Sequence, residues 1–451
     1  MTEVDRVQVR LQQEYHLRVL RIYMDFTPTE KPLAVFTLTL SKGEDVALLT
    51  ASLPELGFAP REHGGPLEGV LPDTYAIPEH VVVALKAWLD EDAAAGQPLW
   101  LQLSVPLGLL AAVPWEEFLQ PQLGVPILRL PCQALAPRIP RAGIDTVVCL
   151  SSPANEPDLQ ERVDAFVREV PPELAQRTRF HLFGDRTIYP YLCDLQRQYQ
   201  GRVHIEIYDP RGAAKVAAGA QSANPWLGWM EAALGQGSVD FVHFICHGAR
   251  SLDEGMLLLA AAPGKEHTGQ PSCVDHTSLV AFLDYLGAWC VAFTSAPTER
   301  SAAGLRMLQT AVAQHRPGPA VVHDMNVPGS REALQATYRF LLGEDAHPPA
   351  AAAVALYCHP ILLAAHANDT VSNRQLASYT LDERLHGKVS DPAIPWLASS
   401  QRKLESTAGA LAEAVEAGAV GRAQARKLVL DAVTREVRKA AAGQARRRRA
   451  T

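Results

Sequence analysis

The pattern of hydrophobic and polar positions changes near residue 140. Before that point polar and apolar side chains alternate over short runs, as they do in half-buried strands. The strands predicted here are 17–23, 33–40 and 98–105, and helical spacing predicts helices over 78–91 and within 109–119. In the second helix Pro114 suits the first position, and Glu116 and Glu117 suit the positive end of the dipole. We interpret it as a well-capped structural helix.

After a proline-rich connection, buried strands alternate with amphipathic helices. The predicted strands are 146–150, 179–183, 203–208, 239–246, 256–260, 288–293 and 320–323, and the predicted helices are 159–170, 189–199, 226–234, 275–286, 302–315, 330–342 and 350–356. This order predicts an α/β fold with a mainly parallel central sheet and right-handed crossovers. We expect a β-rich N-terminal subdomain over 1–140, an α/β core over 141–397, and a helical, basic appendage over 398–451.

Composition narrows the class of protein. A chain of 451 residues with 47% hydrophobic and 20% charged residues is long enough for two or three globular units. Its formal net charge of −7 argues against a nucleic-acid binder, which needs a basic face. The exception is the run Arg446 to Arg449, which could contact nucleic acid or an acidic surface. A solvated basic end is the favoured interpretation of this run.

Targeting and redox signals are few. The seven cysteines are scattered and include no Cys-x-x-Cys pair, which fits neither a zinc site nor a disulfide framework. No apolar run reaches the roughly 18 to 20 residues needed to cross a bilayer, and the charged start is unlike a signal peptide. We expect a cytoplasmic protein with reduced thiols, no membrane contact, no metal and no other cofactor.

The stretch from Val239 to Arg250 carries the clearest chemical signal. An apolar strand run ends there on His247-Gly248, and the next predicted strand ends in the polar loop that begins at Thr294. The carboxyl ends of parallel strands border a ligand crevice, so a nucleophile and an imidazole base from neighbouring strands would meet there. Gly248 would leave its N–H open toward an oxyanion. A purely structural histidine is the alternative.

The succession of buried strand, Cys-His-Gly, acidic loop, glycine-containing hairpin, helix, buried strand and small-residue loop resembles the CHAT proteases, bacterial members of the caspase and separase clan. Three further stretches are similar to that family: 98–131 with its Pro-Trp-Glu segment, 320–328, and 338–343. Together they span roughly residues 95 to 360. The resemblance implies a caspase-like sandwich fold and the activity of a cysteine endopeptidase.

The resemblance also implies a biological role. Such proteins act as effectors in bacterial conflict or antiphage systems and cut a partner protein after a sensor is triggered. This chain shows no sensor repeat, so the trigger is expected from a protein encoded nearby or from self-assembly. A catalytically dead binding or assembly scaffold is the alternative. A nucleotide-binding domain is a weaker idea, because no Gly-rich phosphate loop follows any predicted strand.

Carried over by position, the resemblance makes His247 the catalytic base and Gly248 the oxyanion N–H donor. The nucleophilic cysteine is expected in the loop after Phe293, where this chain has Ala296. A methyl group cannot attack a carbonyl, so the sequence as given should not cleave. An engineered trapping variant, which we favour, a natural pseudoprotease, and Ser295 as a substitute nucleophile are the three explanations.

Substrate specificity remains open at this stage. The resemblance implies that the loops after residues 150 and 297 hold the residue before the cut. Within them Glu156 and Glu299 suit a basic side chain, whereas Arg300 and the nearby Arg250 suit an acidic one. Ser151 begins the first of these loops. The opposite charges give no single prediction.

Overall fold

The computed structural model describes the following parts of the chain: residues 8, 11–12, 15–26, 32–40, 45–58, 75–91, 97–104, 107–133, 143–151, 176–215, 222–235, 239–251, 254–264, 270–295, 298–342, 345, 347–360 and 362–363. Residues 1–369 and 370–451 form separate compact units. The predicted helix over 159–170 and the appendage over 398–451 lie outside the described residues.

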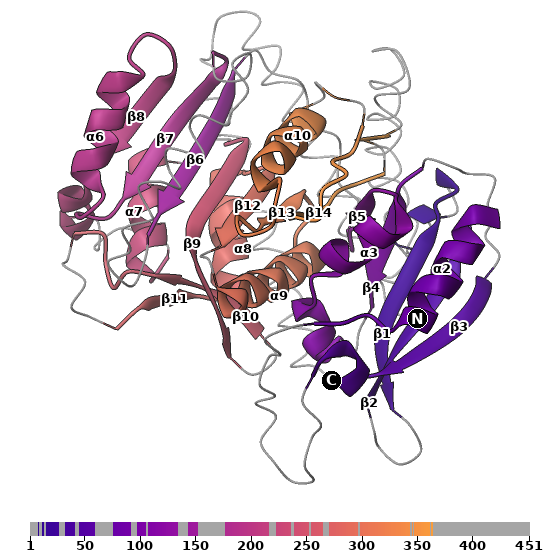
Figure 1. The fold of residues 1–451 in the computed structure, drawn as a ribbon. Helices are drawn as coiled ribbons and strands as arrows, with labels where there is room; N and C mark the ends of the chain where they lie inside the picture. Colours follow the sequence, from indigo (N-terminus) through magenta and orange to yellow (C-terminus); the bar gives the residue numbers. More distant parts are fainter. Residues whose placement is uncertain are drawn as a thin grey trace, which may run out of the picture. The chain divides into compact units, whose positions relative to one another are not determined.

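A mixed sheet of 14 strands is the centre of the first unit. The strands are β1 Val19–Phe26, β2 Pro32–Thr39, β3 Asp45–Ser52, β4 Leu99–Leu103, β5 Ile127–Arg129, β6 Ile144–Leu150, β7 Thr178–Gly184, β8 His204–Tyr208, β9 Phe241–Ser251, β10 Glu254–Leu259, β11 Ser272–Val274, β12 Cys290–Ser295, β13 Ala320–His323 and β14 Val354–Tyr357. They lie in the order β3-β2-β1-β4-β5-β14-β13-β12-β9-β6-β7-β8, with β10 and β11 branching from β9 (Figure 1).

Seven α-helices accompany this sheet in the described residues. They are α2 Glu79–Glu91, α3 Trp115–Leu123, α6 Tyr189–Gln198, α7 Pro225–Leu234, α8 His276–Leu286, α9 Glu299–His315 and α10 Ser330–Leu342, with 3-10 turns at η1 Pro54–Leu56, η2 Gly108–Ala112 and η3 Pro210–Lys215. The strands β6, β7, β8, β9, β12 and β13 pair in parallel. The prediction of an α/β fold with a mainly parallel central sheet is therefore confirmed.

Helices cover both faces of the parallel part of the sheet. Side chains of α7, α8 and α9 share one apolar core with alternate residues of β9 and β12, including Phe244, Cys246 and Phe293. Side chains of α6 and α10 pack on the opposite face, where Ile245 meets Leu334. Strand β9 is thus buried on both sides, as its nearly continuous apolar run predicted.

The N-terminal strands belong to the same sheet as the core. Strands β1 to β3 form an antiparallel meander, β4 and β5 extend it in parallel, and β5 meets β14 through the pair Arg129 and Tyr357. The helix α9 of the core also contributes Ala303 and Met307 to the apolar cluster under α2 and α3. The regions predicted as an N-terminal subdomain and a core therefore lie in one compact unit over the described residues.

The predicted helix over 350–356 is wrong. Residues 354–357 form the strand β14, which pairs antiparallel with β13 and parallel with β5. The alanine-rich run has high helix propensity, but all four of its strand residues are buried between two strands, and this tertiary environment overrides the local preference. Three further strands, β3, β5 and β11, were not predicted.

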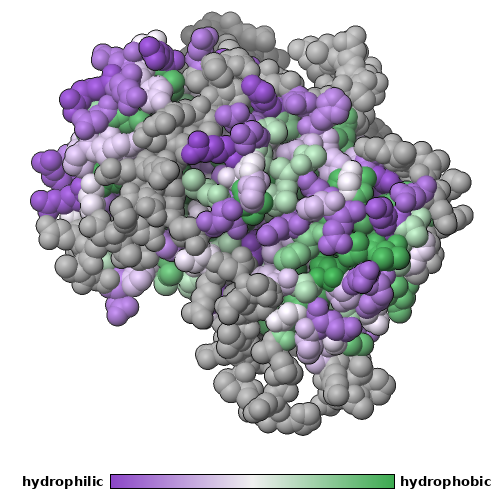
Figure 2. All heavy atoms as spheres, viewed as in Figure 1, coloured by the Kyte–Doolittle hydropathy of each residue, from purple (hydrophilic) through white to green (hydrophobic). Residues whose placement is uncertain are grey.

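On the face drawn in Figure 2, the surface of the N-terminal region is more apolar than that of the opposite end of the sheet. Among the described residues, the large apolar side chains most open to solvent are Leu48 of β3 and Val83 of α2, which are 63% and 60% exposed. Figure 2 shows apolar surface gathered over this region and mostly hydrophilic surface over α6. No helix in the described part of the chain is long and apolar enough to span a membrane.

Candidate functional site

The order of the strands marks one place on the sheet as a crevice. The chain runs from β6 outward through β7 and β8, then returns to β9 on the other side of β6 and continues to β12 and β13. The direction of strand order therefore reverses between β6 and β9. In open α/β sheets ligands bind outside the carboxyl ends of the strands at such a switch point.

His247 lies at this switch point. Its strand β9 pairs with β6 as far as Ile245 and with β12 as far as Cys246, so His247 is the first residue of β9 beyond the ends of both neighbours. The strand then continues into a hairpin, in which His247 faces Leu258 of β10. The side chain is half-buried. The structure thus brings His247 to the carboxyl edge of the sheet, as the sequence predicted.

Gly248 differs from the prediction of an open N–H. Its N–H donates a hydrogen bond of 2.8 Å to Oγ of Ser301, which is 2% exposed in the first turn of α9. A Cβ at position 248 would lie 2.2 Å from the carbonyl oxygen of Ser301. Close packing of α9 on β9 is therefore a sufficient reason for glycine here, and in this structure the amide faces a hydroxyl of the protein.

The end of β12 bears on one of the three explanations for the missing nucleophile, namely Ser295 as a substitute. Ser295 is fully buried, and its Oγ has no hydrogen-bond partner within the described residues. It is in register with Cys246, so strand alternation turns it to the α9 face, away from His247. Ser295 is therefore a poor partner for that imidazole. Ala296 lies outside the described residues.

The structure describes the predicted substrate-binding residues to different extents. Ser151 is fully buried, and its Oγ accepts a 2.8 Å hydrogen bond from the N–H of Ala260, so its prediction as a substrate contact is not supported. Arg250 is half-buried on β9, opposite Gly255. Glu299 and Arg300 begin α9, but their side chains are not described. Glu156 lies outside the described residues.

The acidic residues near the motif that the structure describes are Asp240, Asp209 and Glu254. Asp240 precedes β9 at the far edge of the sheet, where its Oδ2 accepts a 2.9 Å hydrogen bond from the N–H of Asp145. Asp209 accepts from the N–H of Arg211 in a local turn. Glu254 is exposed at the start of β10, opposite Ser251. Asp253 lies outside the described residues.

The cysteines offer no reactive thiol beside His247 in the described residues. Cys246 is 1% exposed and belongs to the α9 face of the sheet. Burial raises the pKa of Cys149, Cys290 and Cys358, which keeps these thiols protonated and unreactive. Cys273 is exposed, but on β11. A cluster that could hold a metal ion is likewise absent from the described part.

A buried polar network lies under the site, and sequence reasoning missed it. His243 of β9 places Nδ1 2.7 Å from the hydroxyl of Tyr338 and Nε2 2.7 Å from Oγ1 of Thr294. The same Oγ1 lies 3.2 Å from Nδ1 of His323, whose Nε2 is 2.9 Å from the carbonyl oxygen of Ser330. The only signal in the sequence was a histidine within an otherwise apolar strand run.

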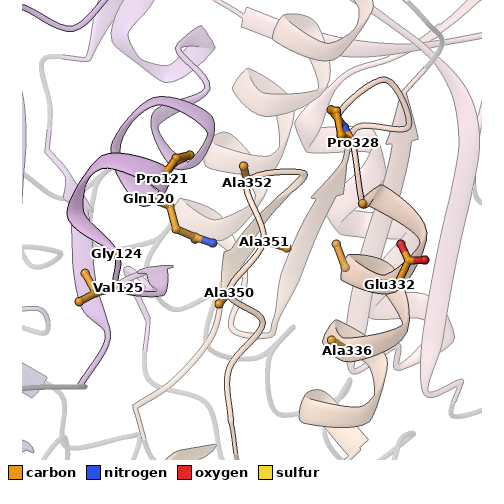
Figure 3. A pocket seen from close by; sticks show the side chains of 12 residues that line it. Gln120, Pro121, Gly124, Val125, Pro328, Glu332, Ala336, Ala350, Ala351 and Ala352 are labelled. Atoms are coloured by element: carbon orange, nitrogen blue, oxygen red, sulfur yellow. The ribbon is translucent and has the colours of Figure 1, made fainter.

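A pocket of about 610 Å³ opens elsewhere, between α3, the start of α10 and the segment before β14. Figure 3 shows Gln120 extending from α3 toward Ala351, with Glu332 and Ala336 on α10. Small residues make up most of its lining. None of the predicted site residues lines it, so the pocket and the crevice at His247 are separate features.

Comparison with protein families and with curated proteins finds no match for this chain. The class that the fold itself defines is an α/β protein with helices on both faces of a mainly parallel sheet. The finer assignment therefore depends on the geometry around His247.

Proposed function

We propose that this chain is a caspase-like cysteine peptidase of the CHAT type that lacks its nucleophile in the sequence as given. It takes up a segment of a partner protein at the carboxyl ends of β9 and β12. The observation that carries the proposal is the position of His247, directly beyond the ends of both neighbouring strands at the switch point. In this proposal His247 is the base, and position 296 is where a peptidase would carry its nucleophile.

The face of the sheet that Ser295 occupies argues against Ser295 as the nucleophile. Thr294 bonds to His243, so these two side chains share one face of the sheet, and His247 is on the same face by alternation along β9. Ser295 is on the other face. Neither Ala296 nor Pro297 has a nucleophilic atom, so the chain as given would bind a partner without cutting it.

A natural binding scaffold is the second candidate, and the Gly248 contact favours it. In a working acyl-transfer site the amide that stabilises the oxyanion points at the substrate. Here the N–H of Gly248 donates to Ser301 instead. A scaffold that only holds a protein segment needs no such open donor.

A cytoplasmic role in bacterial defence, with an activating protein encoded nearby, is part of the peptidase proposal.

The first test introduces a thiol and needs no substrate. Ala296→Cys is alkylated with iodoacetamide across pH 5 to 10, and the rate at each cysteine is followed by mass spectrometry. An ordinary thiol titrates near pKa ~8.5, whereas one beside an imidazole is activated at lower pH. We expect the new thiol to titrate at least about one unit lower, and His247→Ala to return it to about 8.5.

Two matched controls accompany this test. The native, exposed Cys273 serves as the reference thiol in the same digest. Pro297→Cys moves the thiol by one residue along the chain, and the pH dependence of its alkylation should not change when His247 is replaced by Ala. The proposed pairing of His247 with position 296 is contradicted if the thiol at 296 shows the same pH dependence as Cys273 and His247→Ala does not change it.

The second test separates the peptidase from the scaffold. Ala296→Cys is incubated with purified proteins encoded beside its gene, and products are identified by mass spectrometry. Cleavage that disappears in the Ala296→Cys, His247→Ala double variant supports the peptidase. Stable binding of one of these proteins without cleavage, by the same variant, supports the scaffold.

A further inference from the structure

Only one assignment of donors and acceptors fits the hydrogen bonds of the buried network. A carbonyl oxygen can only accept, so Nε2 of His323 must donate to Ser330, and a neutral His323 then accepts at Nδ1. The hydroxyl of Thr294 therefore donates to His323. The oxygen of Thr294 in turn accepts from Nε2 of His243, whose Nδ1 is left to accept from the hydroxyl of Tyr338.

Every polar group in this network has a hydrogen-bond partner of the right kind only while both histidines are neutral. His243 is fully buried and His323 is 2% exposed. A second proton on either ring would turn an accepting nitrogen into a donor that faces a hydroxyl already donating to it. Burial lowers the pKa of His243 to about 3, with the charge of His323 adding to the effect, and lowers that of His323 to about 4.

The titratable groups around the network come from several elements. Tyr338 of α10 lies against His243, and burial raises its pKa well above the usual value. Cys290 of β12 adds to that rise, and Asp324, which follows β13, acts on His323 in the opposite sense to burial. On the β6 side the cross-strand neighbour of His243 is Val148, which is apolar.

The network ties together the two strands that end at the site. His243 is four residues before His247 on the same face of β9, and Thr294 is two residues before position 296 on β12. Two residues of a strand span roughly 6.5 Å, so Thr294 lies about one layer of side chains beneath the site and His243 about two layers beneath it. His323 and Tyr338 fix this pair to β13 and α10.

We propose that His243 and Thr294 are positioning residues, whose hydrogen bond ties β9 to β12 and so fixes the position of His247 at the carboxyl edge of the sheet. This inference rests on the proposed function, because it concerns the same pair of positions. It adds that the alignment depends on a hydroxyl at 294 and on a neutral ring at 243. Neither residue touches the substrate.

The test uses the introduced thiol as a reporter of alignment. In the Ala296→Cys protein, Thr294→Val keeps the side-chain shape and removes the hydroxyl, whereas Thr294→Ser keeps the hydroxyl. We expect Thr294→Val to move the thiol pKa back toward about 8.5 and to slow alkylation at pH 7 roughly tenfold. Thr294→Ser should restore the parent behaviour, which a merely structural role of the methyl group would not explain.

The outcomes distinguish the two proposals. If the parent thiol is unshifted and indifferent to His247→Ala, the proposed function fails. If the parent thiol is shifted and Thr294→Val leaves it unchanged, the proposed function survives and this inference is overturned.

A second measurement covers the case in which Thr294→Val does not fold. In the unaltered protein, ¹⁵N-labelled imidazoles should show His243 and His323 both as the tautomer protonated at Nε2. Neither ring should titrate above pH 5. A ring protonated at Nδ1, or one that titrates near pH 6.5, would contradict the inference.

Discussion

Two buried polar networks cross the same sheet, and they differ in charge. One joins the N-terminal strands to the core: Nε and Nη2 of Arg129 on β5 bind both carboxylate oxygens of Glu116 on α3, at 2.6 and 2.9 Å. Its Nη1 reaches Oε1 of Gln309 on α9 at 3.4 Å. The other network, at His243, contains only neutral groups.

The difference concerns how each network responds to protons and to loss of a partner. Burial opposes the charge of Arg129, but Glu116 outweighs it and the guanidinium pKa is raised. This network therefore stays charged, and either partner alone would be a buried, uncompensated ion. The histidine network is the reverse, because it is satisfied only without charge. We infer that the first network joins two regions permanently, while the second makes the site sensitive to acid.

The largest expected effect is the loss of one charged partner. Glu116→Ala should lower the free energy of unfolding by about 3 to 5 kcal/mol, because Arg129 is left buried without its carboxylate. Urea unfolding measures this. The control Glu79→Gln, at the exposed start of α2, should change stability by less than about 0.5 kcal/mol. A loss below about 1 kcal/mol for Glu116→Ala would show that the ion pair is dispensable.

Low pH should destabilise the fold through the histidine network. Histidine titrates near pKa ~6.5 when unfolded, and the folded values are about 4 for His323 and about 3 for His243. The unfolded chain thus takes up protons first as pH falls. The contribution of the two buried histidines to stability is therefore fully present above pH ~6.5 and declines below it. At pH ~4.5 the loss is on the order of a few kcal/mol for the two histidines together.

A comparison of variants isolates this effect from the titration of carboxylates. His323→Gln keeps an amide that can donate to Ser330 but cannot titrate, so stability should fall less steeply between pH 6.5 and 4.5. The matched control is His204→Gln at the exposed start of β8, which removes an imidazole from the surface and not from the network. Equal slopes for the unaltered chain and His323→Gln would contradict the acid sensitivity of the network.

The smallest expected effect comes from the end of the neutral network. Tyr338→Phe removes the donor to His243 and leaves a buried nitrogen without its hydrogen bond, at a cost of about 1 to 2 kcal/mol. Tyr285→Phe on α8 is the control, since no hydrogen bond of that hydroxyl is seen in the described part of the chain. Equal urea midpoints for the two variants would mean that water or a rearranged side chain replaces Tyr338.

Much of the fold was predictable because its strands and helices have clear periodicity. The apolar run before His247 identified a strand buried on both faces, and the placement of His247 at a strand end followed from it. Prediction failed where local preference and environment disagree, as at residues 354–357, which are helix-forming in composition and form β14 in the sheet. Whether position 296 serves as the nucleophile site stays a prediction.

The roles of individual polar side chains were harder to predict. Glu116 was interpreted as a helix-dipole residue, but its carboxylate binds Arg129, 13 positions away. Gly248 was assigned an open amide, whereas the approach of Ser301, 53 positions away, occupies it. In both cases the partner comes from another element, and no local pattern specifies which distant group will be within hydrogen-bond reach.

By itself, the sequence of this protein determined the alternation of strands and helices, the burial of β9 and the absence of a nucleophilic side chain at positions 296 and 297. Only the tertiary structure decided that Gly248 donates to Ser301, that Ser295 faces away from His247, and that His243, Thr294 and His323 form one directed chain. The physical reason is that periodicity reports burial, which is local to each element. Hydrogen-bond partners are set by how the elements pack and register against one another.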